Sequence, residues 1–293
     1  MASNSFRLGV IGGSGIYQMN AAKVVREHAI ETPFGNPSDP IIEATIGSDT
    51  VMFLPRHGKG HRYLPTEVNY RANIFALKTL GVTHILSVSA VGIMQEYIKR
   101  GDLVVPDQIY DRTKGIRAST FFGDGIVGHV AFADPFCNKM RAFVRDAAAS
   151  AGGEVHFGGT YICMEGPQFS TRAESKFYRQ EIGCSVIGMT AIPEAKLARE
   201  AEICYAVVAL ATDYDCWHEG EEDVSVQAVL EVLAANATLA NRVVANLSAS
   251  LPAKATTCGC HSAAKYAIMT NPSVIPETTR KRLGPLYGKY FAT

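Results

Sequence analysis

Short apolar runs alternate with longer segments whose apolar residues recur at helical spacing along most of this chain. This alternation constrains the fold most strongly, because it is typical of strands and helices that pack as layers of an α/β structure. Glycine, proline and polar residues bound these segments, as expected at the ends of strands and helices. We expect strands at residues 7–12, 50–55, 82–90, 102–106, 159–163, 184–189 and 203–212, and helices at residues 66–80, 138–150, 171–182, 193–202 and 225–248.

The composition changes once, after the last expected helix. That helix carries Val226, Val229 and Leu230 in an apolar stripe, and such a stripe is typical of a helix face in the core. Beyond Leu251 the chain contains four prolines and has only a weak period. The sequence therefore predicts one domain over residues 1–251 and a C-terminal extension over residues 252–293 that packs on the same domain.

Composition excludes several classes of protein. The 28 basic residues balance the 28 acidic ones, and 47% of the residues are hydrophobic, so neither disorder nor a broad nucleic-acid or membrane-surface footprint is expected. No apolar run reaches the roughly 18 residues of a membrane helix, and the first residues lack the order of a signal peptide. We expect a cytoplasmic protein that contacts neither membrane nor nucleic acid.

Seven scattered cysteines are too sparse for a secreted disulfide scaffold, and most are expected to be buried thiols. Cys258 and Cys260 flank one glycine, and three interpretations stay open for them: a small-ring disulfide, a partial metal site, or two thiols. A zinc site takes about four ligands, whereas only these two cysteines and His261 are local. Metal is therefore the least favoured interpretation, and no metal site is predicted.

Three expected strands end in residues suited to an anion. The first ends in a glycine turn that contains Ser14, the second is followed by Arg56 and His57, and the third ends at Ser89. Glycine turns let backbone N–H groups approach an anion, and arginine binds oxyanions bidentately. Because ligands bind at the carboxyl ends of strands in open α/β sheets, we expect these residues to converge on one anion.

Seven separated motifs occur in an order that is similar to one known family. They are GGSG at 12–15, TPFGNPSD at 32–39, PRHGKGH at 55–61, SVSAVG at 87–92, MEGPQFSTR at 164–172, GMTAIPE at 188–194 and ATDYDCW at 211–217. With these motifs the chain resembles the purine nucleoside phosphorylase family in its trimeric branch, and most closely the members that act on S-methyl-5'-thioadenosine.

The resemblance implies a single α/β domain with a mixed, partly barrel-like central sheet flanked by helices, assembled as a homotrimer or a dimer of trimers. It also implies reversible phosphorolysis of a purine N-glycosidic bond with inversion at the sugar carbon. No metal or organic cofactor is expected, because orthophosphate itself is the nucleophile and a co-substrate. Some thermostable members have a disulfide at the positions that match Cys137 and Cys204.

Residue by residue, the resemblance assigns most of the site. Phosphate would be bound by Ser14, Arg56, His57, Ser89, the backbone N–H of Ala90, and Thr190. The nucleoside would contact His61 and Met189 at the ribose, Phe169 and Ser170 at the base, an apolar wall of Val226, Val229 and Leu230 at the 5' group, and His129 of the neighbouring subunit.

Asp213 and Asp215 are the expected catalytic pair. Cleavage leaves an anionic purine, and a carboxylic acid that donates to N7 stabilises this charge. Asp213 must then be protonated when substrate is bound, with its pKa raised by desolvation and by the neighbouring Asp215. Asp215 would accept a hydrogen bond from the 6-amino group. Ser170 and Asp213 replace the Glu and Asn of the 6-oxopurine enzymes, so a 6-aminopurine is expected.

The expected activity is that of a pentosyltransferase in purine and methionine salvage, which converts S-methyl-5'-thioadenosine and phosphate to adenine and 5-methylthioribose 1-phosphate. The near alternative is a broader-specificity purine nucleoside phosphorylase acting on adenosine or inosine. Two further classes stay open: a nucleoside hydrolase that uses water, and a binding protein without catalysis. Arg56 and the three hydroxyl-bearing positions argue against the first, and Asp213 argues against the second.

Overall fold

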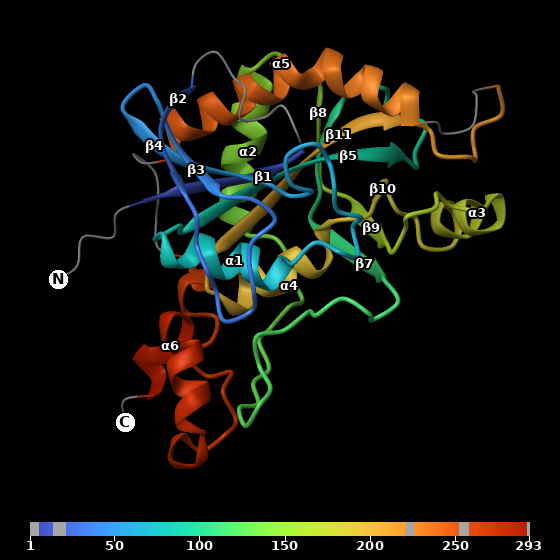
Figure 1. Cartoon of the computed structure of the whole chain (residues 1–293). Helices are drawn as coiled ribbons and strands as arrows, with labels where there is room; N and C mark the ends of the chain where they lie inside the picture. Colours follow the sequence, from blue (N-terminus) through green and yellow to red (C-terminus); the bar gives the residue numbers. More distant parts are fainter. Residues whose placement is uncertain (1–5, 14–21, 221–225, 252–257, 292–293) are drawn as a thin grey trace.

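The computed structural model describes residues 6–13, 22–220, 226–251 and 258–291 (Figure 1). Within the helix that begins at Val226 it describes only the backbone of residues 226, 228–231 and 233–236. Eleven described strands form one sheet: β1 Leu8–Gly12, β2 Ala22–His28, β3 Ile41–Ile46, β4 Asp49–Pro55, β5 His84–Ile93, β6 Leu103–Val105, β7 Gln108–Arg112, β8 Val155–Phe157, β9 Thr160–Met164, β10 Val186–Gly188 and β11 Cys204–Asp213.

The sheet is mixed, and β5 is its branch point. Strands β4, β1, β5 and β11 run parallel, whereas β2, β3 and β4 form an antiparallel meander. Over residues 84–87, β5 pairs with β1, and over residues 92–93 it pairs with antiparallel β10. On its other edge β5 pairs with β11 over residues 84–92. The expected single α/β domain with a large mixed sheet is confirmed.

The core lies on both faces of this sheet, as β11 shows by its alternation. Tyr205 and Val207 face one apolar cluster, whereas Ala206 and Val208 face the other. Successive side chains of a strand point to opposite faces, so a strand covered on both sides must be apolar throughout. All ten residues of β11 are buried, which explains why the strand is apolar from Cys204 to Ala211, before the polar Thr212 and Asp213 at its end.

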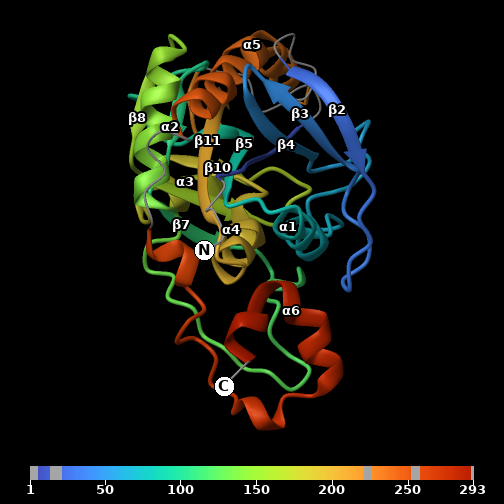
Figure 2. The same cartoon turned by 90° about the vertical axis from the view of Figure 1, so that its left-hand side faces the viewer.

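Helices cover the two faces (Figures 1 and 2). α2 and α5 pack together on one face, and α1 and α4 pack on the other. Local sequence sets several helix starts: the Asn69 side chain accepts from the N–H of Ala72 at the start of α1, and Thr171 and Glu174 form a reciprocal capping box for α3. The helices span α1 Tyr70–Thr79, α2 Asn138–Ser150, α3 Arg172–Gln180, α4 Ala191–Glu200, α5 Val226–Ser250 and α6 Glu277–Phe291.

All expected strands and helices overlap observed ones, although their bounds shift. The helix expected from residue 66 begins at Tyr70, because Asn69 caps it. Four strands and one helix were not predicted: β2, β3, β7, β8 and α6. β2 is exposed over most of its length and three of its seven residues are charged, and α6 contains Pro285, so neither shows a clear apolar period.

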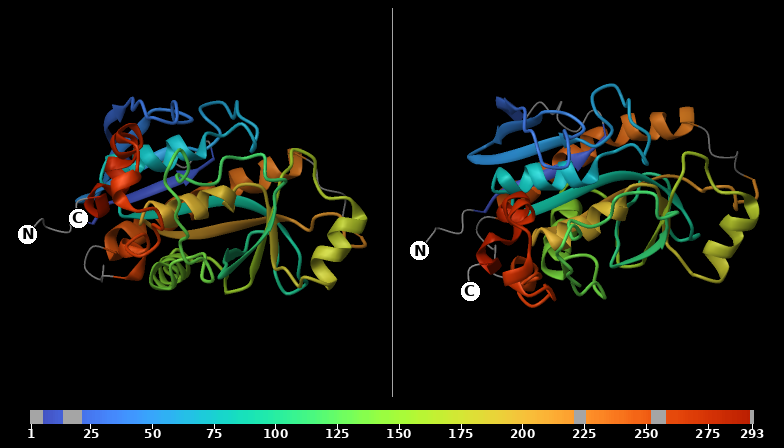
Figure 3. Two further views of the ribbon diagram at one scale, coloured as in Figure 1. Left: turned by 90° about the horizontal axis from the view of Figure 1, so that it is seen from below. Right: turned by 60° about the horizontal axis from the view of Figure 1, so that its bottom comes forward.

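The described part of the C-terminal segment, residues 258–291, packs beside the loop that follows β7 (Figures 1–3). It contains two short 3-10 helices, η1 Gly259–Ser262 and η2 Pro272–Val274, before α6. Tyr287 of α6 stacks on Phe122 with ring centroids 5.1 Å apart, and the Tyr290 hydroxyl donates to Glu202 at 2.6 Å. No helix in the described ranges is both long and apolar enough to cross a membrane.

Leu247 tests the α2/α5 layer, because its side chain is fully buried against the sheet. Leu247→Ala should lower the free energy of unfolding by about 2–5 kcal/mol, since it removes apolar contacts and leaves a cavity. Thr238→Ala, at an exposed position of the same helix, is the control. Equal urea midpoints for the two variants would contradict this packing.

Candidate active site

The candidate site lies at one edge of the sheet, where β1, β4, β5 and β11 end. The pairing register places Gly12 beside Pro55, and the N–H of Arg56 donates to the Gly12 carbonyl at 2.9 Å. Ala209 of β11 lies beside Ser89, and Asp213 lies beside Gly92. Parallel strands bring their carboxyl ends together, so Arg56 and Ser89, two of the residues expected to converge, lie at one edge, and Asp213 lies there with them.

β10 reaches the same place from the opposite direction. Its residues Val186 and Ile187 pair with Ile93 and Gly92 of β5 in an antiparallel register. The chain after Gly188 therefore runs back along β5 toward Ser89 and carries Met189 and Thr190 with it. Two motifs that are about 100 residues apart in the sequence are joined in this way.

Arg56 is buried at the centre of this edge, with 2% of its surface exposed. Its guanidinium contacts Glu194 bidentately, with Nε to Oε2 at 2.9 Å and Nη2 to Oε1 at 3.1 Å. Nη2 also donates to the Ser87 hydroxyl at 2.7 Å, and Nη1 donates to the carbonyl of Val88 at 3.2 Å. The Tyr205 hydroxyl completes the group by donating to Glu194 at 2.9 Å.

These contacts keep Arg56 charged and oriented. Burial works to lower the pKa of the guanidinium, but the negative charge of Glu194 and its hydrogen bonds with Arg56 together raise this pKa. Within the described residues Nη1 has one acceptor for its two N–H groups, the Val88 carbonyl. One N–H of Nη1 is thus available to an incoming oxyanion.

His57 lies next to Arg56 and is neutral at physiological pH. Burial, and then the charge of Arg56, lowers the pKa of His57 to about 4. Its Nδ1 lies 2.9 Å from the carbonyl oxygen of Tyr63, which can only accept, so Nδ1 carries the proton. Nε2 is then an acceptor for a hydroxyl. The exposed His61 stacks on His57 with ring centroids 4.2 Å apart.

Ser89 and Thr190 lie close to a buried tyrosine that sequence reasoning missed. The Tyr161 hydroxyl is buried and has no hydrogen-bond partner within the described residues. Burial raises the pKa of this hydroxyl, and the side chains of Ser89 and Thr190 are near enough to oppose that effect. Ala90 follows Ser89 on β5 and is half-buried. This edge of the sheet thus gathers three hydroxyl groups, those of Tyr161, Ser89 and Thr190.

Asp213 and Asp215 are both buried beside Gly92 at the end of β11. Asp213 Oδ1 accepts from the backbone N–H of Asp215 at 3.0 Å, and Asp213 Oδ2 lies 2.7 Å from the Thr212 hydroxyl. Burial raises the pKa of Asp215, the nearby hydroxyls of Ser175 and Ser170 oppose the shift, and the charge of Asp213 adds to it. Ser170 thus lies near Asp215, and its hydroxyl donates to the Met164 sulfur at 3.6 Å.

Gly92 is required by this close approach. A Cβ atom at Gly92 would lie 2.8 Å from Ile187 and 3.2 Å from Asp213 Oδ1. Any larger residue would push the carboxylate away from the sheet edge. Phe169, from the loop before α3, is 42% exposed, and an aromatic ring is suited to stacking on a planar ligand.

A second buried ion pair fixes the position of Met189. Arg117 Nε donates to Glu165 at 2.6 Å, while Arg117 Nη1 donates to the carbonyl oxygens of Met189 and Ile192. Gly166, at φ +69°, lies against the Met189 side chain, where a Cβ atom would come within 2.5 Å of the sulfur. The half-buried Met189 is thus held between β10 and the loop after β9.

For five predicted site residues, no contact within the described part of the chain places the side chain at this edge of the sheet. Ser14 lies outside the described residues, and the described parts of Val226, Val229 and Leu230 are limited to the backbone of α5. His129 contacts the C-terminal segment, where its N–H donates to the Ala267 carbonyl at 2.9 Å. Its side chain is exposed.

The phosphorylase superfamily model matches residues 7–249. The chain belongs to the phosphorylase superfamily.

Relatives in this superfamily are similar over nearly the whole length. The chain is 56% identical to the S-methyl-5'-thioadenosine phosphorylase of Geobacter sulfurreducens, over 97% of this chain and 98% of the relative. A methylthioadenosine phosphorylase from an Antarctic soil metagenomic library has a crystal structure with a TM-score of 0.92, 48% identity, and coverage of 97% and 99%.

A further solved structure is that of methylthioadenosine phosphorylase from Schistosoma mansoni in complex with adenine. It is 40% identical with a TM-score of 0.80, over 85% of this chain and 92% of that one.

The sequence did not predict the buried carboxylates that hold the arginines of this site. Glu194 and Glu165 pair with Arg56 and Arg117, and both lie within the family motifs. A usable signal existed: a buried arginine needs a carboxylate partner, and Glu194 is an isolated charge in an otherwise apolar stretch. Arg117 and Tyr161 carry no comparable signal in the sequence.

Glu194→Ala should lower the free energy of unfolding by about 3–5 kcal/mol, because it leaves the Arg56 charge buried without its partner. Glu96→Ala is the matched control: Glu96 also pairs with an arginine, at 3.0 Å, but its side chain is 72% exposed. That variant should lose at most about 1 kcal/mol. Chemical denaturation of both variants measures the difference, and equal losses would contradict the structural role of the buried pair.

The lowered pKa of His57 makes stability depend on pH. An unfolded histidine has a pKa near 6.5, whereas that of folded His57 is about 4, so the unfolded state binds the proton first as pH falls. The free energy of unfolding should therefore decrease from pH 6.5 to pH 4, by at most about 3 kcal/mol from this residue. His57→Gln should flatten the pH profile in that window, and an unchanged profile would show that burial of His57 is not the cause.

Proposed function

We propose that this chain catalyses the phosphorolysis of S-methyl-5'-thioadenosine to adenine and 5-methylthioribose 1-phosphate. One observation carries the proposal: Arg56, Ser89 and Asp213 share one sheet edge, in a chain that matches methylthioadenosine phosphorylases over nearly its full length. Orthophosphate is the second substrate and the nucleophile. An oxygen of phosphate attacks C1' of the ribose, the bond from C1' to N9 breaks, and its electron pair leaves on the purine.

Phosphate binds on the side of Arg56. The available N–H of Nη1 donates to a phosphate oxygen, and the hydroxyls of Ser89 and Thr190 and the N–H of Ala90 donate to others. The neutral His57 accepts the proton of monohydrogen phosphate on Nε2, which directs the unprotonated oxygens toward the sugar. Ser14 is assigned to the same phosphate by the family motif that contains it.

Asp213 stabilises the leaving purine. The Thr212 hydroxyl lies 2.7 Å from Asp213 Oδ2 and 3.1 Å from the carbonyl oxygen of Val91. A hydroxyl has one proton. When Thr212 donates that proton to the Val91 carbonyl, Asp213 Oδ2 can carry a proton of its own and donate it to N7 of the purine. That proton passes to N7 as the glycosidic bond breaks, and adenine leaves as a neutral base.

Asp215 and Ser170 select the base. Burial raises the pKa of Asp215, and the nearby charge of Asp213 adds to this. In its ionised form Asp215 accepts from the 6-amino group of adenine, while Asp213 donates to N7. A 6-oxopurine offers an acceptor there instead, and the mismatch costs about 1–3 kcal/mol.

The remaining contacts are made to the ribose, the face of the base and the 5' methylthio group of the substrate. Met189 and His61 contact the ribose, Phe169 stacks on the base, and Val226, Val229 and Leu230 form an apolar wall for the methylthio group. An unpartnered 5'-hydroxyl would be desolvated at such a wall, which favours the thioether. The active form is a homotrimer or a dimer of trimers, in which the exposed His129 serves the site of a neighbouring subunit.

The proposal also includes the domain organisation of the chain and its location in the cell. Residues 1–251 form the phosphorylase domain, and residues 252–293 are an extension packed on it, which the contacts of Tyr287 and Tyr290 support. The enzyme acts in the cytoplasm. The seven cysteines support this location, because none is in a disulfide.

Adenine release from S-methyl-5'-thioadenosine tests the reaction and its acid together. Release should require orthophosphate, and Asp213→Asn should lower kcat by about 10²- to 10⁴-fold, because an amide cannot transfer a proton to N7. Asp146→Asn, an exposed carboxylate on α2, is the control and should retain the rate. Phosphate-independent release would make the protein a hydrolase, and binding without turnover would make it a binding protein.

Adenosine and inosine, tested in the same assay, separate the proposal from a broad-specificity phosphorylase. The kcat/KM for inosine should be about ten- to a hundredfold below that for S-methyl-5'-thioadenosine, from the mismatch at the 6-position alone. Inosine as the best substrate would contradict the roles given to Ser170 and Asp215.

A further inference from the structure

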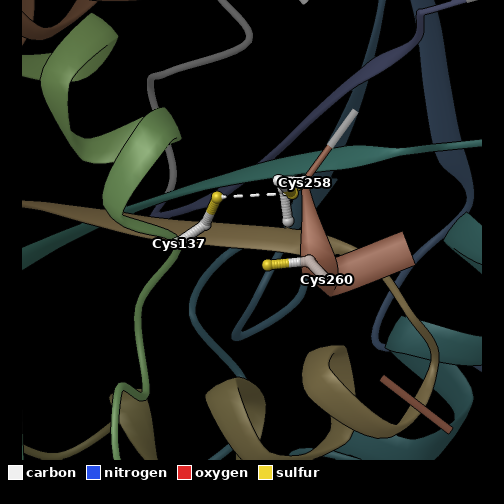
Figure 4. A group of neighbouring side chains, drawn as sticks. Cys137, Cys258 and Cys260 are labelled. Atoms are coloured by element: carbon white, nitrogen blue, oxygen red, sulfur yellow. Dashed lines mark hydrogen bonds between the residues drawn. The ribbon is translucent and has the colours of Figure 1, made fainter. Parts of the chain in front are cut away.

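Four cysteines from three distant segments meet at the end of the sheet opposite the candidate active site. Cys137 caps the N-terminus of α2, Cys204 is the first residue of β11, and Cys258 and Cys260 lie at η1 in the C-terminal segment. All four sulfur atoms lie within 4.8 Å of one another. Figure 4 shows Cys137 at the start of its helix facing Cys258 and Cys260.

We propose that these four cysteines bind one Zn²⁺ ion as a closed tetrathiolate site. Zinc in proteins takes four tetrahedral ligands with Zn–S distances of about 2.3 Å, which places neighbouring sulfurs about 3.8 Å apart. The sulfur of Cys258 lies 3.8 Å from that of Cys137 and 3.0 Å from that of Cys204. Small adjustments of side-chain torsions would bring all four to ligand positions.

The fold adds two cysteines to the metal ligands that are neighbours in the sequence. Only Cys258, Cys260 and His261 are neighbours in the chain, and three ligands do not complete a zinc site. The structure adds Cys137 and Cys204, which precede Cys258 by 121 and 54 residues. The complete set is then four thiols, the softest ligands that the chain offers.

The surroundings suit a thiolate cluster. Cys137, Cys204 and Cys260 are buried, and Cys258 is half-buried. The N–H of Met140 donates to the Cys137 sulfur at 3.5 Å, and the N-terminal end of a helix favours negative charge. His261 Nε2 lies 3.5 Å from the Cys204 sulfur, where the imidazole contacts the cluster from outside.

Metal binding is an acid–base step without a redox change. Each thiol releases one proton as its sulfur coordinates, so Zn²⁺ and four thiols give one tetrathiolate of charge −2 and four protons. A disulfide would instead require removal of two electrons per bond by an oxidant, which the protein does not supply. Zinc therefore fits the reducing cytoplasm, where thiols stay reduced.

The site is structural. Cys204 and Asp213 stand at opposite ends of the ten-residue strand β11, about 30 Å apart at the usual rise per residue. Four protein ligands leave no open position for a substrate. The ion would join the C-terminal segment to α2 and β11, so its effect is on stability rather than on the rate of phosphorolysis.

Metal analysis of the full chain, expressed with zinc and purified under reducing conditions without chelators, tests the proposal. We expect one zinc per chain in the parent protein and in Cys184→Ala, whose cysteine is buried outside the cluster. The single variants Cys258→Ser and Cys137→Ser should lose most of the zinc. Cys260→His, which keeps four ligands, should retain it.

Cobalt replacement identifies the ligands directly. Co²⁺ added to the zinc-free protein should give the intense red-region absorption of tetrahedral cobalt and sulfur-to-cobalt charge transfer, and Cys258→Ser should weaken both. A chelator should lower Tm of the parent protein and leave Tm of Cys258→Ser unchanged. If that variant does not fold, the Co²⁺ spectrum and zinc content of the parent protein still decide the matter.

Two results would overturn the proposal. One is a metal-free parent protein whose intact mass is lower by two hydrogens for each disulfide, which would show that the cluster is oxidised. The other is a metal-free protein in which the cluster cysteines react as ordinary thiols and Co²⁺ produces no charge-transfer band.

Discussion

The buried pair of Arg56 and Glu194 is the interaction on which the rest of the site depends. A guanidinium that is 2% exposed costs several kcal/mol to desolvate, and only a carboxylate with good geometry offsets this. Glu194 lies on α4 and Arg56 follows β4, 138 residues earlier, so the pair ties a helix on one face to the sheet edge. Nε and Nη2 of Arg56 donate to Glu194. Nη1 donates to the Val88 carbonyl and has a second N–H for a bound oxyanion.

Two further constraints place the other half of the site. Because β11 is covered on both faces, its apolar side chains fix its register against β5, and this register puts Asp213 beside Gly92. The second buried pair, Arg117 with Glu165, binds the backbone of Met189 and so holds the chain after β10. Charged groups that touch no ligand thus position those that do, as is common for rigid binding sites.

The sequence predicted the parts of the molecule that are encoded locally. Apolar runs located seven strands, and a helix over residues 138–150 was predicted with the bounds of α2. Motifs at strand ends predicted that Ser14, Arg56 and Ser89 would converge, because parallel strands end at one edge. Exposed β2 and the proline-containing α6 lack the periodicity that such reasoning needs. Pairings across many residues, such as Arg56 with Glu194 or Cys137 with Cys258, leave no local pattern.

A crystal structure with sulfate and adenine bound would locate the anion and the base together, because sulfate stands in for phosphate and adenine is the leaving base. We expect a sulfate oxygen within hydrogen-bond distance of Arg56 Nη1, near the hydroxyls of Ser89 and Thr190. We also expect N7 of adenine within hydrogen-bond distance of Asp213. A sulfate that binds away from Arg56, or an adenine whose N7 faces away from Asp213, would contradict the roles given to these residues.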